Sequence, residues 1–346
     1  MGLPNNHGLP VVFKRQHGAK NLITDVKGVR VGHSTINDGD IHTGVTAVLP
    51  HGGNLFKDKV MAAVSVINGF GKSTGLIQIE ELGTIETPIM LTNTLSAGTV
   101  SDALTRVMLE QNQDIGTQTG TVNCVVTECN DGALNDIRGM HVKEKHVREA
   151  IANASENFAE GAVGGGTGMI CLGLKGGIGS ASRILKIDGQ PYTIGALVMS
   201  NFGAAGNLVI GGRHYDTGKY MPAGSLDRGS IIIILGTDIP MSERQLKRTA
   251  KRSVIALART GSCCGNGSGD IALAFTTANR VPHYSGKDIL PMKMFYDEHI
   301  DAVFEAAAEA VEEAILSSLY HGETMTGIRG KYVMGLLDFI QKYESD

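Results

Sequence analysis

The amino-acid sequence predicts an α+β domain in which sheets and helices form layers. Short apolar runs alternate with Gly- and Asn-containing turns over the first two thirds of the chain, a pattern typical of strands. The last third shows the 3.6-residue periodicity of amphipathic helices. No Pro/Ser-rich or charged linker divides the 346 residues. Strands followed by amphipathic helices favour a single layered domain.

The expected elements follow in chain order. The first 25 residues read as an extended arm and an entry turn. We expect strands where apolar runs end at polar turns, namely within 44–98, 120–139, 193–203 and 230–238. Residues 161–179 are glycine-rich with an apolar centre. Whether the strands pair parallel or antiparallel does not follow from the pattern.

Four helices are expected, at about 141–160, 242–257, 298–321 and 331–343. In the second, Ser242 is a suitable N-cap, and an apolar stripe is formed by Leu246, Ala250, Val254 and Leu257. The third helix has its stripe at Phe304, Ala308, Val311 and Ile315 and stops at Gly322.

Composition excludes several classes of function. The net charge is −4, Trp is absent, and no basic block could follow a nucleic-acid backbone. No apolar run reaches 18 residues, and the N-terminus has neither a signal-peptide core nor a myristoylation pattern, because position 6 is Asn. We therefore expect a cytoplasmic protein that binds neither nucleic acid nor membrane.

Metal and cofactor motifs are missing. The five cysteines have no CxxC spacing, so buried free thiols are expected, and His141 and His146 do not share a helical face. Residues 71–73 (GKS) resemble the end of a phosphate-binding loop, but position 66 is Val where that motif needs Gly. The glycines of 161–168 do not fit the dinucleotide pattern either. We expect no metal and no cofactor.

Ser230 is the first candidate for chemistry. In DRGSIIIILGTD (227–238), a charged turn leads through Gly229 directly into a run of five aliphatic residues, which indicates a buried strand. A serine at this place could attack the carbonyl of Gly229 with its own hydroxyl. It could equally be no more than a polar strand start.

Three further polar residues, in two segments, lie at the ends of apolar runs. Ser268 and Asp270 stand among glycines at the mouth of a strand in RTGSCCGNGSGDIALAF (259–275), a pattern that also fits a tight turn. Asn201 ends the apolar run before SNFG, where its amide could reach an anionic oxygen or could simply form a turn.

Taken together, six segments resemble the P1 family of self-processing aminopeptidases. They are GVTAVLPHGG (44–53), ETPIMLTNTLSAG (86–98), ECNDGALNDIRG (128–139), SNFG (200–203), RGSIIIILGTDIP (228–240) and RTGSCCGNGSGDIALAFTTAN (259–279). The resemblance extends from about residue 25 to about 330. It implies a single αββα sandwich of the N-terminal-nucleophile type, made as a precursor that cleaves itself.

The resemblance also implies roles for particular residues. Cleavage would fall between Gly229 and Ser230, giving fragments 1–229 and 230–346. Ser230 would be the nucleophile and Asn201 an oxyanion partner, with Ser268 and Asp270 as polar support. Some relatives have Glu in place of Asp270.

The implied substrates are short peptides, amino-acid amides or esters, and the implied assembly is a homo-oligomer, a tetramer of cleaved pairs. A substrate with a free amine needs a counter-charge, for which Glu128 and Asp131 are candidates, although a solvated Glu and a turn-forming Asp fit equally well. Some relatives carry Tyr where this chain has Ala133, which bears on turnover and substrate range.

Two other functions remain open at this point. An acyltransferase resembling ornithine acetyltransferase would use a related fold, although that family typically has a Thr nucleophile. An unprocessed, non-catalytic homologue would share the fold without the reaction.

Overall fold

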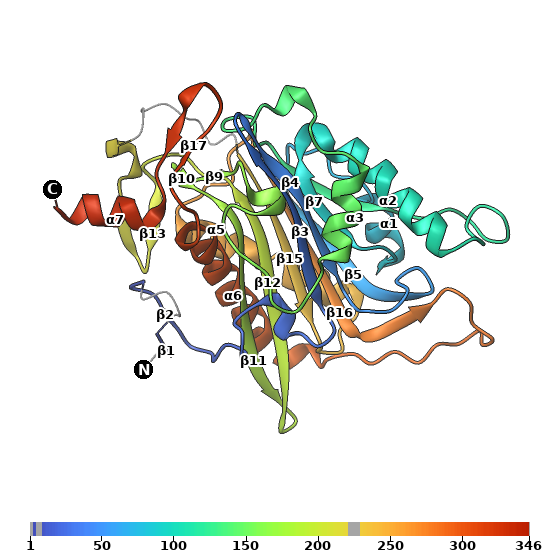
Figure 1. The fold of residues 1–346 in the computed structure, drawn as a ribbon. Coiled ribbons are helices and arrows are strands. Elements are labelled where there is room, and N and C mark those ends of the chain that lie inside the picture. Colours follow the sequence, from blue (N-terminus) through green and yellow to red (C-terminus); the bar gives the residue numbers. More distant parts are fainter. Residues whose placement is uncertain (1–2, 5–8, 221–228, 346) are drawn as a thin grey trace.

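Two β-sheets stack face to face, and a layer of helices covers the outer face of each (Figure 1). The structure is a computed structural model that describes residues 3–4, 9–220 and 229–345. The larger sheet has six strands in the order β11 (Gly177–Ile187), β12 (Gln190–Asn201), β15 (Ser230–Thr237), β16 (Gly269–Pro282), β5 (Asp58–Gly69) and β6 (Thr84–Ile85). The smaller sheet has the order β3 (Arg30–Asp38), β4 (Ile41–Leu49), β7 (Ile89–Asn93) and β8 (Val125–Cys129).

Both sheets are mixed. The pairs β15–β16 and β7–β8 are parallel, and the other neighbours within the two sheets are antiparallel. A parallel pair needs a crossover connection. Two helices, α4 (Glu243–Ala250) and α5 (Ser253–Thr260), provide it between β15 and β16.

The remaining helices and small hairpins complete the layers. The other helices are α1 (Leu76–Leu82), α2 (Ala97–Gln111), α3 (Glu144–Ala152), α6 (Asp301–Tyr320) and α7 (Leu336–Ser345). The two-stranded pairs are β1 (Leu3–Pro4) with β2 (Val12–Phe13), β9 (Ile170–Cys171) with β10 (Leu174–Lys175), β13 (Leu208–Ile210) with β14 (Arg213–Tyr215), and β17 (Met325–Thr326) with β18 (Tyr332–Val333).

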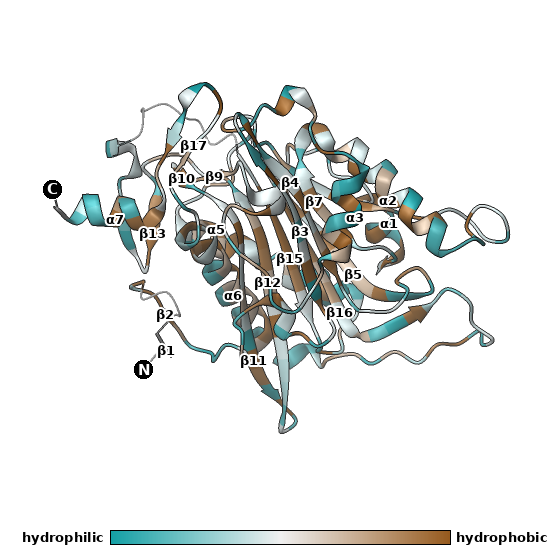
Figure 2. Cartoon of the chain, viewed as in Figure 1, coloured by the Kyte–Doolittle hydropathy of each residue, from teal (hydrophilic) through white to brown (hydrophobic). Residues whose placement is uncertain are grey.

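Three apolar clusters fill the spaces between the four layers, which confirms the αββα sandwich. One lies between the two sheets, one between the larger sheet and α4, α5 and α6, and one between the smaller sheet and α2 and α3. Strand β15 supplies two of them by alternation: Ile232 and Ile234 face the other sheet, whereas Ile231 and Ile233 face the helices. Figure 2 shows these central strands as the most hydrophobic part of the chain.

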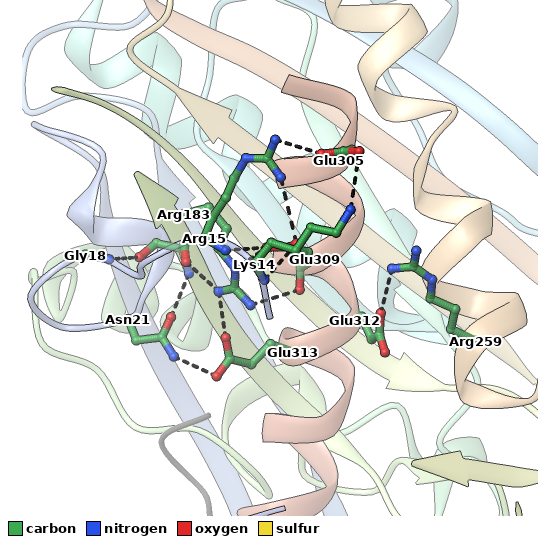
Figure 3. Close-up of polar contacts among 11 residues, drawn as sticks. Lys14, Arg15, Gly18, Asn21, Arg183, Arg259, Glu305, Glu309, Glu312 and Glu313 are labelled. Carbon is green, nitrogen blue, oxygen red and sulfur yellow. Dashed lines mark hydrogen bonds and ion pairs between the residues drawn. The ribbon is translucent and has the colours of Figure 1, made fainter. Parts of the chain in front are cut away.

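Buried charges hold the N-terminal arm against the larger sheet. Arg183 on β11 is 1% exposed and forms ion pairs with Glu309 (3.2 Å) and Glu313 (2.6 Å) on α6. Arg15 of the arm reaches Glu305 on the same helix at 2.8 Å (Figure 3). The arm is joined to this network through Glu309, whose carboxylate accepts from the backbone N–H groups of Lys14 and Arg15 at 3.1 and 3.2 Å. Removing one partner of a buried ion pair such as Arg183–Glu309 typically costs about 3–5 kcal/mol.

Most expected elements are confirmed, but the helix boundaries need correction. The chain turns at Lys251 and Arg252, so 242–257 is two helices, and Val254 is 40% exposed instead of facing the core. The turn shifts the helical phase, so Ala256 is buried in place of Val254, whereas Leu246, Ala250 and Leu257 are buried as expected. The third helix is confirmed as α6, with its stripe buried.

Two other helices are shorter than expected because strand pairing competes for their ends. The helix expected at 141–160 ends at Ala152, since Ser155 exchanges backbone hydrogen bonds with Val31. The helix expected at 331–343 starts only at Leu336, because 332–333 pair with 325–326. The sequence pattern also missed α1 and α2.

The cysteine expectation holds for three of the five thiols. Cys124, Cys129 and Cys171 are buried, whereas Cys263 is exposed and Cys264 is half-buried on a loop. In the part of the chain that the structure describes, no helix combines the length and hydrophobicity that crossing a bilayer requires.

Candidate active site

Ser230 lies where three neighbouring strands of the larger sheet end. It is the first residue of β15, opposite Asn201 at the end of β12 and opposite Gly269 at the start of β16. The whole of β15 is buried, as the aliphatic run predicts, and Ser230 itself is 7% exposed. The register therefore brings three separate motifs of the sequence to one place.

The position before this serine, Gly229, has no room for a side chain. A methyl group on its Cα would lie 1.9 Å from the carbonyl oxygen of Asn201 and 2.7 Å from the Cα of Phe202. The backbone before Ser230 is thus packed directly on the end of β12. Asp227 and Arg228, the other residues of the predicted charged turn, lie outside the described residues.

The loop before β16 presents its polar groups to the serine. The backbone N–H of Gly269 donates to the Ser230 hydroxyl at 3.1 Å. The hydroxyl of Ser268 donates to the carboxylate of Asp270 at 2.5 Å, and both residues are at most 1% exposed. Asn68 at the end of β5 donates to the carbonyl oxygens of Ser268 and Gly265, which fixes this loop.

The side-chain amide of Asn201 is held at both ends. Its Oδ1 accepts from the backbone N–H of Ile170 at 2.9 Å, and its Nδ2 donates to the carbonyl of Asn130 at 3.0 Å. An amide carries two N–H groups, so one remains for another acceptor. The orientation of that donor is set before any substrate binds.

Glu128 comes to the site from the other sheet. It lies on β8 and is 3% exposed, so it is not a solvated side chain. Its carboxylate accepts from the backbone N–H of Lys72 at 2.7 Å and from the hydroxyl of Thr94. A methyl group on Gly71 would lie 3.5 Å from this carboxylate and 4.0 Å from the Cα of Gly269, so Gly71 separates Glu128 from the Ser230 region.

Asp131 is the second residue of the polar turn, which we define as residues 130–139. Its side chain is fully buried and accepts from Asn135 Nδ2 at 3.0 Å, and burial raises its pKa to about 6. Its backbone carbonyl accepts from two later N–H groups, which closes the turn. Ala133, on the same turn, is exposed.

The sequence patterns did not identify Lys175. It is fully buried on β10, and its ammonium donates to the carbonyl oxygens of Gly166, Met169 and Gly176. Burial lowers its pKa to about 7. These carbonyls belong to the glycine-rich segment that contains Ile170, the partner of Asn201. The signal that could have identified it is its place as the single cation inside the apolar run MICLGLKGGIG.

Comparisons with known proteins agree with this fold. Residues 21–333 match the model of peptidase family S58. The β-peptidyl aminopeptidase BapA of Sphingosinicella microcystinivorans is 39% identical over 96% of this chain and 89% of its own length.

Solved structures are similar over 99% of both chains. The PH0078 protein of Pyrococcus horikoshii OT3 has a TM-score of 0.92 at 50% identity. A β-aminopeptidase of Burkholderia sp. has a TM-score of 0.88 at 42% identity. The L-aminopeptidase D-Ala-esterase/amidase of Ochrobactrum anthropi, described as a prototype of the serine aminopeptidases and a variant of the Ntn hydrolase fold, has a TM-score of 0.88 at 38% identity.

Fold and site thus define an α+β hydrolase of the N-terminal-nucleophile type. The chain belongs to peptidase family S58. It is a serine aminopeptidase by class, as the sequence resemblance implied.

Proposed function

We propose that this protein cleaves itself between Gly229 and Ser230 and that the new N-terminal Ser230 then removes N-terminal residues from short peptides, amino-acid amides or esters. The observation that carries the proposal is the convergence of Ser230, Asn201 and Gly269 at the ends of three paired strands. The products would be fragments 1–229 and 230–346, which stay together in one sandwich because β12 and β15 pair along their length.

Self-cleavage would begin with the Ser230 hydroxyl attacking the carbonyl carbon of Gly229. A C–O bond forms, the C–N bond breaks, and the hydroxyl proton passes to the nitrogen, leaving an ester and a free α-amine. Water then hydrolyses the ester, which gives Gly229 a carboxylate and restores the hydroxyl. The tight packing of Gly229 on Asn201 supports this step, because reacting atoms held in place need little further ordering.

The freed amine supplies the base that a serine nucleophile needs. An α-amino group has a pKa of about 7.7–8.0 in model peptides, close to working pH, and it shares its Cα with the hydroxymethyl group. In this proposal Ser268 and Asp270 position the amine and the Asn201 amide stabilises the oxyanion, which the Ser268–Asp270 hydrogen bond and the fixed Asn201 side chain support.

Of the two candidates for binding the substrate's ammonium, the geometry favours Glu128. Its carboxylate lies beside Gly71, on whose other side is Gly269, whereas the Asp131 carboxylate holds the polar turn together. Membership in a peptidase family favours hydrolysis over acyl transfer. The cytoplasmic location and the homo-oligomer, a tetramer of cleaved pairs, stay predictions.

Expression of wild type, Ser230→Ala and the surface control Ser285→Ala tests the proposal. Wild type and the control should each give two bands on a denaturing gel. The mass of the smaller fragment should match a chain that starts at Ser230. Ser230→Ala should remain one band of 36.5 kDa and release no p-nitroaniline from amino-acid p-nitroanilides. A cleaved or active Ser230→Ala protein would contradict the proposal.

A further inference from the structure

A small cavity with an excess of positive charge lies beside the polar turn. Its volume is about 250 Å³, and it is lined by the turn and by residues 328–331 between β17 and β18. Ligand pockets usually measure about 300–1,000 Å³, so this space suits one end of a ligand rather than a whole one.

Three cations line this cavity: Arg138, Arg329 and Lys331. They are exposed, and none of them forms an ion pair with any described residue. Among the described residues of the lining, Asp136 is the one carboxylate, and it also contacts His141 Nε2 at 2.9 Å. The cavity therefore presents three positive charges against one carboxylate, in a chain whose net charge is −4.

The walls of the cavity are held in place. The backbone N–H of Ile328 donates to the carbonyl of Leu134 at 2.8 Å, and Gly327 packs so closely that a methyl group on it would lie 2.4 Å from that oxygen. Arg329 has a φ of 58°, which is uncommon outside glycine. The β17–β18 hairpin thus packs on the polar turn, and this contact fixes the backbone positions of Arg329 and Lys331.

The cavity and the nucleophile are linked through the polar turn. The carbonyl of Asn130, the first residue of the turn, accepts from Asn201, which pairs with Ser230. Strands β17 and β9 lie at the same end of the larger sheet (Figure 1), and the backbone N–H of Lys175 on β10 donates to Met334 just after β18. Glu128 lies on β8, two residues before Asn130, so an acidic group precedes the polar turn and a basic cluster lies along it.

This polarity matches a short peptide with free ends. We propose that the cavity binds the carboxylate of a substrate whose ammonium is held at Glu128, an inference that rests on the proposed aminopeptidase function. An extended residue spans about 3.3–3.6 Å, so two or three residues place the carboxylate roughly 7–10 Å beyond the ammonium. The preferred substrates are then dipeptides and tripeptides rather than amides or esters without a carboxylate.

The test compares a dipeptide with its C-terminal amide on wild type, on the Arg329→Gln/Lys331→Gln double variant, and on Lys186→Gln. Lys186 is an exposed lysine on β11, beside the turn to β12, at the end of the larger sheet opposite to Ser230. In the double variant we expect KM for the dipeptide to rise about tenfold at unchanged kcat, with the amide and the Lys186→Gln control unaffected. In wild type, raising the salt concentration should reduce the preference for the dipeptide, because exposed charges are screened.

A third substrate distinguishes the source of the carboxylate. If a dipeptide amide with Asp or Glu as its second residue regains the low KM, the cavity accepts an acidic side chain as well as a chain end. Equal KM values for dipeptide and amide in wild type would overturn the proposal. A similar loss for both substrates in the double variant would also overturn it, because it would show a structural role. Activity on p-nitroanilides in either case would leave the aminopeptidase function standing.

Discussion

The backbone N–H of Gly269 donates a hydrogen bond to the hydroxyl of Ser230 at 3.1 Å. A methyl group at position 269 would lie 3.0 Å from that hydroxyl and 2.7 Å from the carbonyl oxygen of Phe70. The absence of a side chain at Gly269 is therefore what leaves room for the nucleophile between β5 and β15.

Gly269→Ala should slow self-cleavage. Overpacking typically costs about 1–3 kcal/mol, which corresponds to roughly 5–150-fold in rate if the strain falls on the reacting serine. The fraction cleaved is followed over time on denaturing gels. Gly286→Ala is the control, because a methyl group there meets nothing within 4 Å. Equal cleavage rates for the two variants would show that the nucleophile does not need this space.

Asp270→Asn should lower kcat by about 100-fold, within the range of a lost proton-transfer or positioning group, with little change in KM. The amide keeps the shape of Asp270 but removes the charge that accepts from Ser268. Asp270→Glu should retain more activity, since it keeps the charge. The measurement is steady-state hydrolysis of an amino-acid p-nitroanilide by fully cleaved enzyme. A rate equal to wild type for Asp270→Asn would contradict the assigned role.

Asn201→Asp should lower kcat by about 100- to 1,000-fold, as expected for an oxyanion donor. The aspartate can still accept from Ile170 but can no longer donate, either to the oxyanion or to the carbonyl of Asn130, so thermal unfolding is measured beside kcat. Asn207→Ala, an exposed asparagine nearby, is the control. If thermal unfolding of Asn201→Asp is unchanged and kcat is also unchanged, the oxyanion role is wrong.

Glu128→Gln should raise KM for substrates that carry a free amine by roughly 30-fold, which corresponds to about 2 kcal/mol for a lost buried charge partner. The matched pair of substrates is alanine p-nitroanilide and the analogue that lacks its amine, propionyl p-nitroanilide. The analogue should lose nothing, and the exposed control Glu81→Gln should change neither substrate. An equal effect on both substrates would assign Glu128 to structure rather than to the ammonium.

Lys175 should make the protein more stable as pH rises above about 7. Its pKa is lowered to about 7 in the folded chain, so between pH 7 and its ordinary value the unfolded chain binds the proton and the folded chain does not. The free energy of unfolding therefore increases with pH in this window, and it is constant below it, where both states are protonated.

Guanidinium unfolding at pH 6.5 and pH 9 measures this effect, in a Ser230→Ala background so that the chain stays in one piece. Lys175→Met should lose this part of the pH dependence, whereas Lys186→Met, at an exposed lysine, should keep it. An identical pH dependence in Lys175→Met and the background would show that Lys175 does not titrate in this window.

Local pattern determined much of this protein by itself. The aliphatic run after Ser230 indicated a buried strand, as the structure has it, and the segments around Asn201, Ser268 and Asp270 stood out as polar groups among glycines, although a turn fitted each of them as well. The 3.6-residue stripe at Phe304, Ala308, Val311 and Ile315 likewise fixed α6 as a core helix.

Tertiary structure decided what depends on residues far apart in the chain. Ser155 pairs with Val31, 124 residues away, and these backbone hydrogen bonds end the helix at Ala152 against its propensity. In the same way, only the pairing of β12, β15 and β16 joins Asn201, Ser230 and Gly269. Burial turned Lys175 from one cation in a glycine-rich run into the anchor of three carbonyls, because a group's neighbours in space, not in sequence, set its solvation.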